Sequence, residues 1–448
     1  MRVLVVNDHA TVGGAAQLFR RTNALLRQAG HHVVEVTGDA LDRTLKAQVR
    51  NRVGPWRQSV QLWRRELVGN AHQLYYPALF AQLTRVLQDG RIDVAHVHNV
   101  HTRLSPQVIP FLRRRGVPVV YQVNDYSFFC NTFWAYNRRL DAPCQRCLRG
   151  SPLWALRYGC VSSLGVNRVD RAALQALTRG VLAVQRPWAQ ADRFLVTSDV
   201  ASALLTEWGV ARERQTKIWN PILEAEVDVP RRLGEEIVFY GTYLPSKGAE
   251  TFAAALEHVA PGCRLGVYLM AMTPAYAARL RTVAERRGLA LTVDSTLRWE
   301  RGLRERVAEA RAVVVPSQWW VTSENVVYEA MWLGKAVILS RMGGNIELVV
   351  EGETGLFFEP RDSYGLADAI NRLWTDAPVA ARMGEAARAR ARTRYSATRF
   401  LTVLEGAYHT AMGRTAYRRS REPVAEAEFV RQQVDAVHQR AKELADHA

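Results

Sequence analysis

Short runs of apolar residues alternate with longer stretches of helical periodicity over the first half of the chain. The apolar runs stand at 2–7, 31–38, 92–99, 117–125, 193–198 and 216–222, and helical patterns stand at 15–28, 106–115, 171–186 and 200–208. A parallel strand buried on both faces is a continuous apolar run in sequence. Alternation of such strands with helices is typical of a doubly wound α/β domain. The pattern therefore predicts a Rossmann-like domain over 1–225.

The same alternation returns after a polar stretch that contains Pro and Gly, where we place the connection between two domains. Strands are predicted at 235–241, 263–269, 289–294, 312–317, 335–340 and 355–360. They predict a second Rossmann-like domain over 226–395. The remaining chain, 396–448, is predicted to form helices and a surface tail, because its last part is rich in Ala, Glu, Arg and Gln.

The charge balance of the chain indicates a phosphate-bearing partner. Lys and Arg number 60 against 43 Asp and Glu, which gives a net charge of +17, and almost all of the cations are Arg. A guanidinium is a planar fork of donors that suits phosphate oxygens. Nucleotide diphosphates, anionic lipid headgroups and nucleic acid are the partners compatible with this charge, and a basic surface that serves only solubility is the alternative. We expect no nucleic-acid partner, because zinc-finger, RNP and helix-turn-helix spacings are missing.

One segment, 41–90, interleaves Arg with aromatic residues, which is typical of a helix lying on a membrane surface. Packing of the same rings against the first domain is the alternative. No apolar run reaches the length of about 18 residues that a membrane-spanning helix needs, and no basic and apolar leader precedes the strand that begins at Arg2. We therefore expect a cytoplasmic protein, with peripheral contact to the inner membrane face through 41–90 as a further option.

Candidate ligand-binding residues stand where strands end, because open parallel sheets bind ligands beyond the carboxyl ends of their strands. Gly13 and Gly14 follow the first strand, and without a Cβ they allow a phosphate or sugar to approach the backbone; a plain turn explains them equally well. Lys247 follows the first strand of the second domain and suits a diphosphate, with an exposed loop cation as the alternative. Gly343 and Gly344 offer a second close approach to a ligand.

The segment 313–340 is the richest in candidate groups, and its pattern predicts a strand, a loop, a helix and another strand. We expect Thr322 or Ser323 to cap the helix, with Glu324 in its first turn. Glu324 and Glu329 are carboxylates, which accept hydrogen bonds from ribose or sugar hydroxyls. Stabilisation of the helix dipole is the alternative for Glu324, worth about 0.3–1 kcal/mol.

These segments carry a family resemblance that covers most of the chain from residue 1 to about 375. The motifs are VGGAA, GHHVVEVTG, DVAHVHN, GVPVVYQVNDY, NPI, YGTYLPSKG and the combination PS…E…EAM.LGKAVILS..GG..ELV.EGETGLFFEP.D. With these motifs the chain resembles a family 4 (group 1) retaining glycosyltransferase with the GT-B fold. The resemblance implies an α/β protein in which two Rossmann-like, doubly wound parallel-sheet domains face a cleft. The first domain would lie on the acceptor side, and the second would bind the donor nucleotide.

The resemblance also implies roles for individual residues. Lys247 would bind the donor diphosphate, Glu329 the ribose hydroxyls, and Ser317 would line the donor sugar. The implied donor-binding set is Gly13, Gly14, Thr242, Lys247, Ser317, Glu324, Asn325, Val326, Glu329, Gly343 and Gly344, and the implied catalytic groups are Asn124, Asp125, Lys247 and Glu324. Cations and helix N–H groups stabilise the leaving diphosphate in such enzymes, so no cofactor is expected for catalysis.

Three positions depart from the pattern of the family. They are Val321, eight residues before Glu329, where a Glu is usual; Thr242, where an Arg is frequent; and Asn124, where a His often meets the donor sugar. Asn donates and accepts hydrogen bonds but does not exchange protons near neutral pH. These changes leave a catalytically impaired nucleotide-sugar-binding partner of another transferase as the alternative to an active enzyme. An epimerase of the same fold is a third hypothesis, for which no convincing acid/base pair stands out.

Four of the five cysteines, Cys130, Cys144, Cys147 and Cys160, fall in an insert at 126–165. The central pair has the CxxC spacing that lets two thiolates of one turn bind a metal ion, and disulfides are rare in the cytosol. We predict a structural zinc site, with unligated thiols and an iron–sulfur cluster as alternatives. The expected protein is thus a metal-independent glycosyltransferase of the hexosyltransferase type. It would transfer a sugar from a UDP- or GDP-sugar to a hydroxyl of a glycan or lipid-linked acceptor in cell-surface polysaccharide synthesis.

Overall fold

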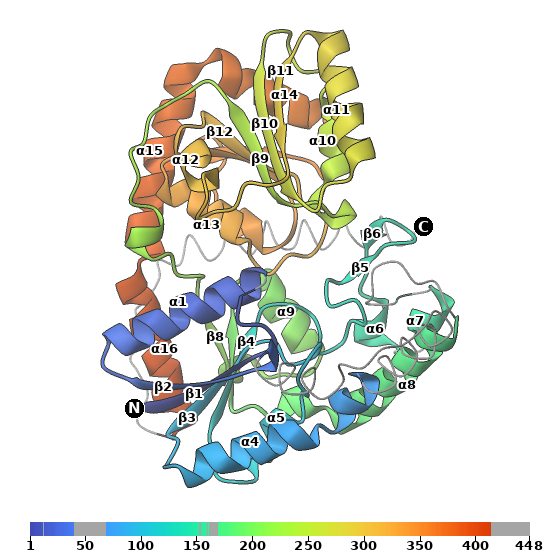
Figure 1. Ribbon diagram of the computed structural model, residues 1–448, viewed down its shortest axis with the longest axis vertical. Coiled ribbons are helices and arrows are strands. Elements are labelled where there is room, and N and C mark those ends of the chain that lie inside the picture. Colours follow the sequence, from blue (N-terminus) through green and yellow to red (C-terminus); the bar gives the residue numbers. More distant parts are fainter. Residues whose placement is uncertain (12, 40–68, 152–153, 159, 161–168, 414–448) are drawn as a thin grey trace, which may run out of the picture. The chain divides into compact units, whose positions relative to one another are not determined.

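The computed structural model describes residues 1–11, 13–39, 69–151, 154–158, 160 and 169–413, which form two compact units (Figure 1). Among the described residues, the first unit comprises Met1–Arg139, Cys144–Trp219 and 400–413, and the second comprises Leu140–Pro143 and Asn220–Arg399. The division falls slightly ahead of the 225/226 boundary expected from the polar stretch. Asn220 belongs to the second unit, where its Nδ2 donates to Asn325 Oδ1 at 2.9 Å.

The first unit is built on a six-stranded sheet in the order β2-β1-β3-β4-β7-β8, with every pairing parallel. The strands are β1 (Arg2–Asn7), β2 (His32–Thr37), β3 (Val94–Val97), β4 (Val119–Val123), β7 (Arg193–Val196) and β8 (Gln215–Lys217). The helices are α1 (Gly14–Gln28), α4 (Pro77–Gln88), α5 (Val108–Arg113), α8 (Val169–Gln185) and α9 (Asp199–Glu207), with 3-10 turns η1 (Pro187–Gln190) and η2 (Arg212–Arg214). The cysteine segment adds β5 (Tyr136–Asn137), β6 (Ala142–Pro143), α6 (Arg146–Arg149) and α7 (Trp154–Arg157).

The second unit has its own six-stranded parallel sheet in the order β11-β10-β9-β12-β13-β14. Its strands are β9 (Ile237–Thr242), β10 (Arg264–Met270), β11 (Ala290–Asp294), β12 (Ala312–Val315), β13 (Ala336–Ser340) and β14 (Gly355–Phe358). Its helices are α10 (Ala249–Ala255), α11 (Pro274–Arg287), α12 (Leu303–Ala308), α13 (Asn325–Trp332), α14 (Ser363–Thr375) and α15 (Ala377–Arg394), with turns η3 (Glu224–Glu226), η4 (Pro245–Lys247) and η5 (Gly343–Glu347); α16 (Ala397–Ala411) follows them. All twelve predicted strands of the two sheets are confirmed.

The apolar runs form strands because helices cover both of their faces. In β1 the four residues Val3 to Val6 are fully buried, and the same holds for all five residues of β13. Local signals fix some helix starts: Ser198 Oγ accepts a hydrogen bond from Ala201 N at 3.1 Å at the start of α9. The predicted doubly wound fold is confirmed in both units.

Each sheet contains one point at which the order of strands along the chain reverses. In the first sheet this point lies between β1 and β3, and in the second it lies between β9 and β12. At such a point the chain segments that follow the two neighbouring strands run to opposite sides of the sheet. The carboxyl ends of the two strands therefore border a crevice, and open α/β sheets bind ligands in this crevice. The fold thus marks one place in each unit where functional residues are expected.

The basic, aromatic segment 41–90 is described only from residue 69 onward, and the predicted tail beyond Gly413 lies outside the described residues. In the described part, Tyr76 and Phe80 are buried, and Phe80 stacks on Phe111 with ring centroids 4.8 Å apart. Tyr75 is 63% exposed. These two buried rings therefore pack within the first unit, as the alternative interpretation expected. In the part of the chain that the structure describes, no helix is long and apolar enough to span a membrane.

Two histidines are fully buried in the first unit. His96 and His98 stack at 4.2 Å, and His96 Nδ1 lies 2.8 Å from the hydroxyl of Tyr408 in α16. Burial lowers the pKa of His96 to about 3 and also lowers the pKa of His98 well below its usual value. Because a buried imidazole resists protonation, both side chains are neutral in the folded protein at neutral pH.

We therefore expect acid to destabilise the first unit. Below about pH 6.5 the unfolded chain takes up protons that the folded chain does not, so stability falls as the pH falls towards the folded-state pKa values. Between pH 6.5 and 5 the loss is about 2 kcal/mol per histidine. Thermal unfolding at a series of pH values measures it. His98→Phe should reduce the fall of Tm with decreasing pH, whereas His409→Gln on α16 should leave it unchanged. If Tm falls equally with pH in the unchanged protein and in both variants, the buried histidines are not its cause.

Candidate functional site

The strand-order reversal of the second sheet brings the predicted lysine and one predicted glutamate into contact. Lys247, the last residue of η4 after β9, donates from Nζ to Glu324 Oε1 at 2.5 Å. Ser317, just beyond β12, donates from Oγ to the same carboxylate oxygen at 2.7 Å. Glu324 is 5% exposed, while the Lys247 side chain is 26% exposed. A buried carboxylate therefore orients a partly exposed cation at the edge where parallel sheets bind ligands.

The start of α13 differs from the sequence prediction. The helix begins at Asn325, and its N-cap residue is Glu324 itself, which makes no side-chain capping bond, so the predicted cap at Thr322 or Ser323 is wrong. The backbone N–H of Glu324 is instead bound by Asn345 Oδ1 at 2.9 Å. A tertiary contact replaces the local cap, and this frees the Glu324 side chain to face Lys247.

Glu329 is buried on the inner face of α13, as expected. Its side chain is 4% exposed, and Oε2 accepts a hydrogen bond from the hydroxyl of Tyr240 on β9 at 3.2 Å. The same hydroxyl lies 3.2 Å from the carbonyl of Val326. Tyr240 thus links the first turn of α13 to the end of β9, where Thr242 is the last strand residue.

Gly343 and Gly344 begin η5 and pack tightly against Val321. Gly343 has φ +65°, and an added Cβ would lie 2.6 Å from the backbone nitrogen of Val321. Gly344 N donates to the carbonyl of Val321 at 2.7 Å. Val321, which occupies the position where the family usually has a Glu, is 1% exposed. Here that position serves the packing of the glycine loop.

Three further residues of this region were missed by the sequence analysis. They are Asn220, which contacts Asn325; Tyr240, which contacts Glu329; and Asn345, which binds Glu324. Asn345 is fully buried, and its Nδ2 has no hydrogen-bond partner among the described residues. Asn220 stands in the NPI motif and Asn345 directly follows the Gly pair, but nothing in the local pattern indicates where their side chains point.

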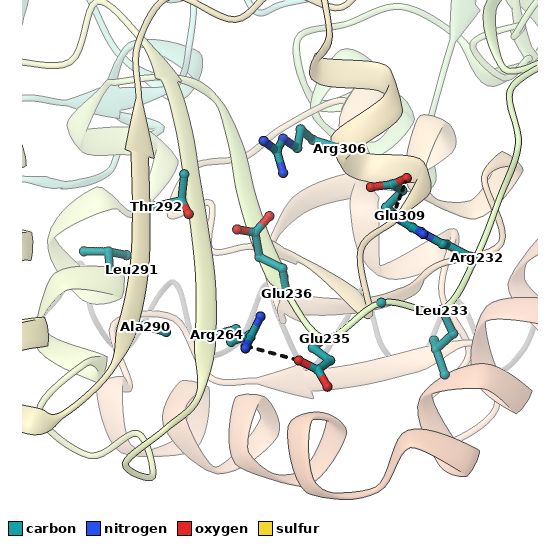
Figure 2. A pocket seen from close by; sticks show the side chains of 11 residues that line it. Arg232, Leu233, Glu235, Glu236, Arg264, Ala290, Leu291, Thr292, Arg306 and Glu309 are labelled. Atoms are coloured by element: carbon teal, nitrogen blue, oxygen red, sulfur yellow. Dashed lines mark ion pairs between the residues drawn. The ribbon is translucent and has the colours of Figure 1, made fainter.

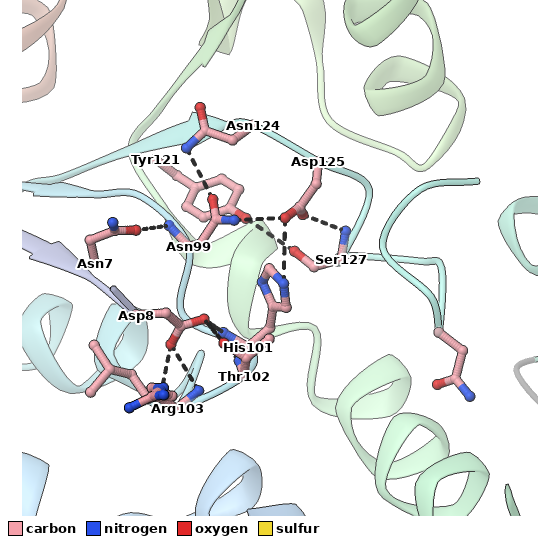
Figure 3. Close-up of polar contacts among 12 residues, drawn as sticks. Asn7, Asp8, Asn99, His101, Thr102, Arg103, Tyr121, Asn124, Asp125 and Ser127 are labelled. Atoms are coloured by element: carbon pink, nitrogen blue, oxygen red, sulfur yellow. Dashed lines mark hydrogen bonds and ion pairs between the residues drawn. The ribbon is translucent and has the colours of Figure 1, made fainter. Parts of the chain in front are cut away.

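The strand-order reversal of the first sheet holds a second polar cluster (Figure 3). Asp8, just beyond β1, accepts hydrogen bonds from the backbone N–H groups of the four residues that follow Val100, at 2.8–3.1 Å, and from Thr102 Oγ1 at 2.8 Å. One buried carboxylate therefore fixes the loop after β3.

The predicted pair Asn124 and Asp125 lies in this cluster. Asn124 donates to Asn99 Oδ1 at 3.0 Å, and Asn99 donates to Asp125 Oδ2 at 2.8 Å. Asp125 also accepts from Ser127 N at 2.9 Å and lies 3.4 Å from His101 Nε2. Because Asp125 is buried and its oxygens are occupied, the geometry favours a role in orienting Asn99 and Asn124.

Gly13 and Gly14 lie at the same edge, where α1 begins. Gly13 has φ +88°, and an added Cβ would meet no atom within 4 Å, so the space over this backbone is open. A side chain is strained at this φ, which favours Gly. The position suits close approach of a ligand to the N-terminus of α1.

The four clustered cysteines lie close enough for their charges to interact. Burial raises the pKa of Cys147 to about 12, with further increases from Cys130, Cys144 and Cys160. No group of three or more His, Cys, Asp or Glu side chains within the described ranges is arranged to hold a metal ion. Four thiols are a suitable donor set for zinc, so the zinc site stays a prediction.

A pocket of about 600 Å³ opens at the opposite edge of the second sheet (Figure 2). It is lined by the segment 232–236 that precedes β9, by the amino ends of β10 and β11, and by Arg306 of α12 and Glu309 directly after that helix. Arg264 pairs with Glu235 at 3.1 Å, and Arg232 pairs with Glu309 at 2.9 Å. Because these charges are matched within the pocket and the carboxyl ends lie elsewhere, we do not assign the donor site to it.

Two family models match the chain. The model described as glycosyl transferase 4-like domain matches residues 13–221, and the model described as glycosyl transferases group 1 matches residues 234–376. The matches cover most of the first unit and most of the second. No curated protein sequence matches the chain.

Solved structures with the same fold are distant in sequence. Sucrose-phosphate synthase of Thermosynechococcus elongatus has a TM-score of 0.61 at 18% identity, over 92% of this chain and 99% of that one. Anabaena HepE in complex with UDP-glucose has a TM-score of 0.57 at 17% identity, over 90% and 98%. A glycosyltransferase of Rickettsia africae has a TM-score of 0.60 at 13% identity, over 92% and 99%. At these identities the similarity establishes the fold, and it confirms the expected GT-B class.

Proposed function

Since the chain belongs to the group 1 glycosyltransferases, we propose that it transfers a sugar, with retention of configuration, from a UDP- or GDP-sugar to a hydroxyl of a glycan or lipid-linked acceptor. The donor binds the second unit at the carboxyl ends of β9 and β12. The acceptor binds the first unit beside Asn124. HepE, a protein of similar fold, was solved with UDP-glucose, which supports a hexose nucleotide as the donor class.

The observation that carries this proposal is the contact between Lys247 and the buried Glu324 at the strand-order reversal. Lys247 supplies a cation at 26% exposure, and the N-terminus of α13 begins one residue beyond Glu324. Both features favour a bound anion. Glu329, already oriented by Tyr240, suits the ribose hydroxyls because a carboxylate only accepts hydrogen bonds.

The proposed chemistry needs no protein nucleophile. The acceptor oxygen bonds to the anomeric carbon while the bond from that carbon to the diphosphate breaks on the same face. The acceptor proton passes to an oxygen of the departing diphosphate. Lys247 and the N–H groups of α13 stabilise the negative charge that develops on the leaving group, which supports catalysis without a divalent metal.

A thermal-shift panel of UDP-, GDP- and ADP-sugars in the presence of EDTA tests donor binding. A ligand at about 100 times its Kd stabilises the folded state by about 2.7 kcal/mol, which raises Tm by roughly 5–10 °C for domains of this size. We expect one nucleotide class to give this shift, and Lys247→Ala and Glu329→Ala to reduce it. A shift that both variants retain would contradict the site.

The alternative is a catalytically impaired protein that binds a nucleotide sugar and assists another transferase. It is based on the departures from the family pattern at Val321, Thr242 and Asn124. The same protein with acceptor and the selected donor separates the two hypotheses, because an active enzyme releases nucleoside diphosphate and an impaired one only binds. We expect release, since the Lys247 cation and the α13 N-terminus are both in place. A donor that binds tightly without any release would favour the binding partner.

We further propose that Cys130, Cys144, Cys147 and Cys160 hold a structural zinc ion. The support is the CxxC pair and the mutual influence of the thiols on their pKa values. Metal analysis of protein purified without added metal should find about one zinc per chain, lost in Cys147→Ser but kept in Cys263→Ser, which alters the fifth, separate cysteine. Zinc-free protein with four titratable thiols would contradict the site.

We also propose that the protein works in the cytoplasm at the inner membrane face in cell-surface polysaccharide synthesis. The net charge of +17 supports contact with anionic lipid. Co-sedimentation with vesicles containing anionic lipid, in low and high salt, is the corresponding assay.

A further inference from the structure

Arginine side chains gather at the carboxyl end of α13, and the proposed transfer chemistry does not use them. Gly334 lies just beyond this helix, with φ +71°. A Cβ added at Gly334 would lie 3.3 Å from Arg231 Nη1 and 3.6 Å from Arg388 Cδ. It would also lie 3.5 Å from Glu385 Oε1. Two arginine side chains and one carboxylate therefore meet over this glycine.

Close packing of α15 against the end of α13 brings Arg388 to this place. A Cβ added at Gly384 on α15 would collide with the carbonyl oxygen of Gly334, so a glycine is needed for the two segments to approach this closely. Arg388 and Arg392 follow on α15, and residues four apart are neighbours on a helix surface. The fold thus holds Arg388 close to both Arg392 and Arg231.

The three guanidinium groups lack acceptors in the protein. No hydrogen bond joins any of them to another residue in the described part of the chain, and Arg231 Nη1 lies 4.0 Å from Glu385 Oε1. The Arg231 side chain is 28% exposed, and Arg392 is also exposed. Of the guanidinium nitrogens of Arg388, only Nε is buried. Donors of all three arginines are therefore accessible to a ligand.

A buried lysine adds to the positive charge. Lys335, the residue before β13, is 2% exposed and donates from Nζ to the carbonyl of Arg232 at 2.8 Å. Burial and the charge of Arg231 lower its pKa to about 8, so most of it is protonated at neutral pH. Burial and the charges of Arg231 and Arg392 also lower the pKa of Arg388. These cations therefore repel one another.

The negative charge nearby is too small to balance them. Glu309 already pairs with Arg232 at 2.9 Å. Glu385 is 73% exposed, so water screens its charge. The carboxyl end of α13 supplies a partial charge of only about −0.5. A bound anion would reduce the remaining repulsion among the cations.

We propose that the arginine cluster of Arg231, Arg388 and Arg392 binds a phosphate group. A guanidinium presents parallel N–H donors that match two phosphate oxygens. A phosphate monoester carries a charge of about −1.5 to −2 at pH 7, which a single carboxylate does not supply. The phosphate belongs either to a small phosphorylated molecule or to the head group of an anionic lipid. The site lies at the end of α13 opposite to Glu324, and binding there does not depend on the proposed function.

Calorimetric titration of the full chain with inorganic phosphate, in a buffer without phosphate, tests the site. We expect saturable binding at the cluster. Arg231→Gln and Arg392→Gln should each weaken it about tenfold or more, because each removes a charged hydrogen-bond donor. Glu385→Gln should strengthen it, because it removes the competing carboxylate. Arg281→Gln, at an exposed arginine of α11, removes the same charge as the arginine variants and should bind as the unchanged protein does.

Lys247→Ala separates this site from the proposed donor site. It should leave phosphate binding at the cluster unchanged. Phosphate affinity that falls in Lys247→Ala but not in Arg231→Gln or Arg392→Gln would place the phosphate at the donor site and overturn the proposal. A negative result with the nucleotide sugars would overturn the proposed function and leave the cluster as a phosphate site.

Co-sedimentation with vesicles distinguishes the two sources of phosphate. The vesicles contain phosphatidylcholine and phosphatidic acid, whose head group is a phosphate monoester. If the source is a lipid, Arg231→Gln and Arg392→Gln should sediment less than the unchanged protein and Arg281→Gln. If it is a small molecule, all four proteins should sediment equally while the calorimetric differences remain. Absence of saturable phosphate binding, or equal affinity in all three arginine variants, overturns the proposal.

Discussion

Replacing Lys247 with alanine is expected to lower kcat by about 100- to 1,000-fold, because it removes a preoriented donor from the charge that develops on the leaving diphosphate. The cation is held in place by Glu324 at 2.5 Å, so little reorganisation is needed when the donor binds. Initial-rate measurements of nucleoside diphosphate release at saturating donor give the effect.

Glu329→Gln should instead weaken donor affinity by about 10- to 100-fold, since it removes one charged acceptor.

The matched control is Lys217→Ala, because Lys217 pairs with Asp199 in the first unit and has no part in the donor site. Lys247→Ala also leaves the buried carboxylate of Glu324 without its cation, which is unfavourable. The double variant Lys247→Ala with Glu324→Gln separates stability from catalysis: its Tm should recover while its activity stays low. Near-normal turnover in folded Lys247→Ala would remove this lysine from the mechanism.

Gly343→Ala is expected to abolish most donor binding. At φ +65° an alanine is strained, and its Cβ would lie 2.6 Å from Val321 N and 2.8 Å from Val321 Cγ1. Such distances force the glycine loop to move, and with it Asn345, which holds the N–H of Glu324. We expect at least a 100-fold loss of affinity by calorimetry, since the loop supports the first turn of α13.

Gly352→Ala is the matched control for this change. Gly352 has φ +75°, but an added Cβ there would meet no atom within 4 Å. Gly352→Ala therefore introduces a backbone strain of about 1 kcal/mol, but its Cβ does not collide with a neighbouring atom as that of Gly343→Ala does with Val321. If both variants bind donor equally well, the close packing of Gly343 has no functional role.

The strands and the general position of the proposed donor site follow from the sequence, because both depend on short-range patterns. Apolar runs such as 335–340 are long enough to identify a buried strand. The runs at 2–7, 235–241, 312–317 and 335–340 directly precede loops that contain candidate residues. The arrangement of these loops follows from strand order, which places Lys247 beside the segment after Ser317. Their proximity could thus be anticipated from a doubly wound fold.

The details that could not be predicted depend on long-range side-chain contacts. Asn345 caps Glu324 from 21 residues away, and Asp8 binds backbone groups of a loop more than 90 residues away. Neither contact leaves a periodic pattern in the sequence. The surroundings of Asp125 are another example: the family resemblance implies a catalytic role for it, and only the structure shows that its oxygens accept hydrogen bonds from Asn99 and Ser127.

A crystal structure of the protein grown with the nucleotide sugar that gives the largest thermal shift would show where the donor binds. We predict that the diphosphate lies within hydrogen-bond distance of Lys247 Nζ, that the ribose hydroxyls face Glu329, and that Gly343 and Gly344 border the ligand. Nucleotide bound at the opposite edge of the second sheet, in the pocket of Arg232 and Arg264, would contradict it.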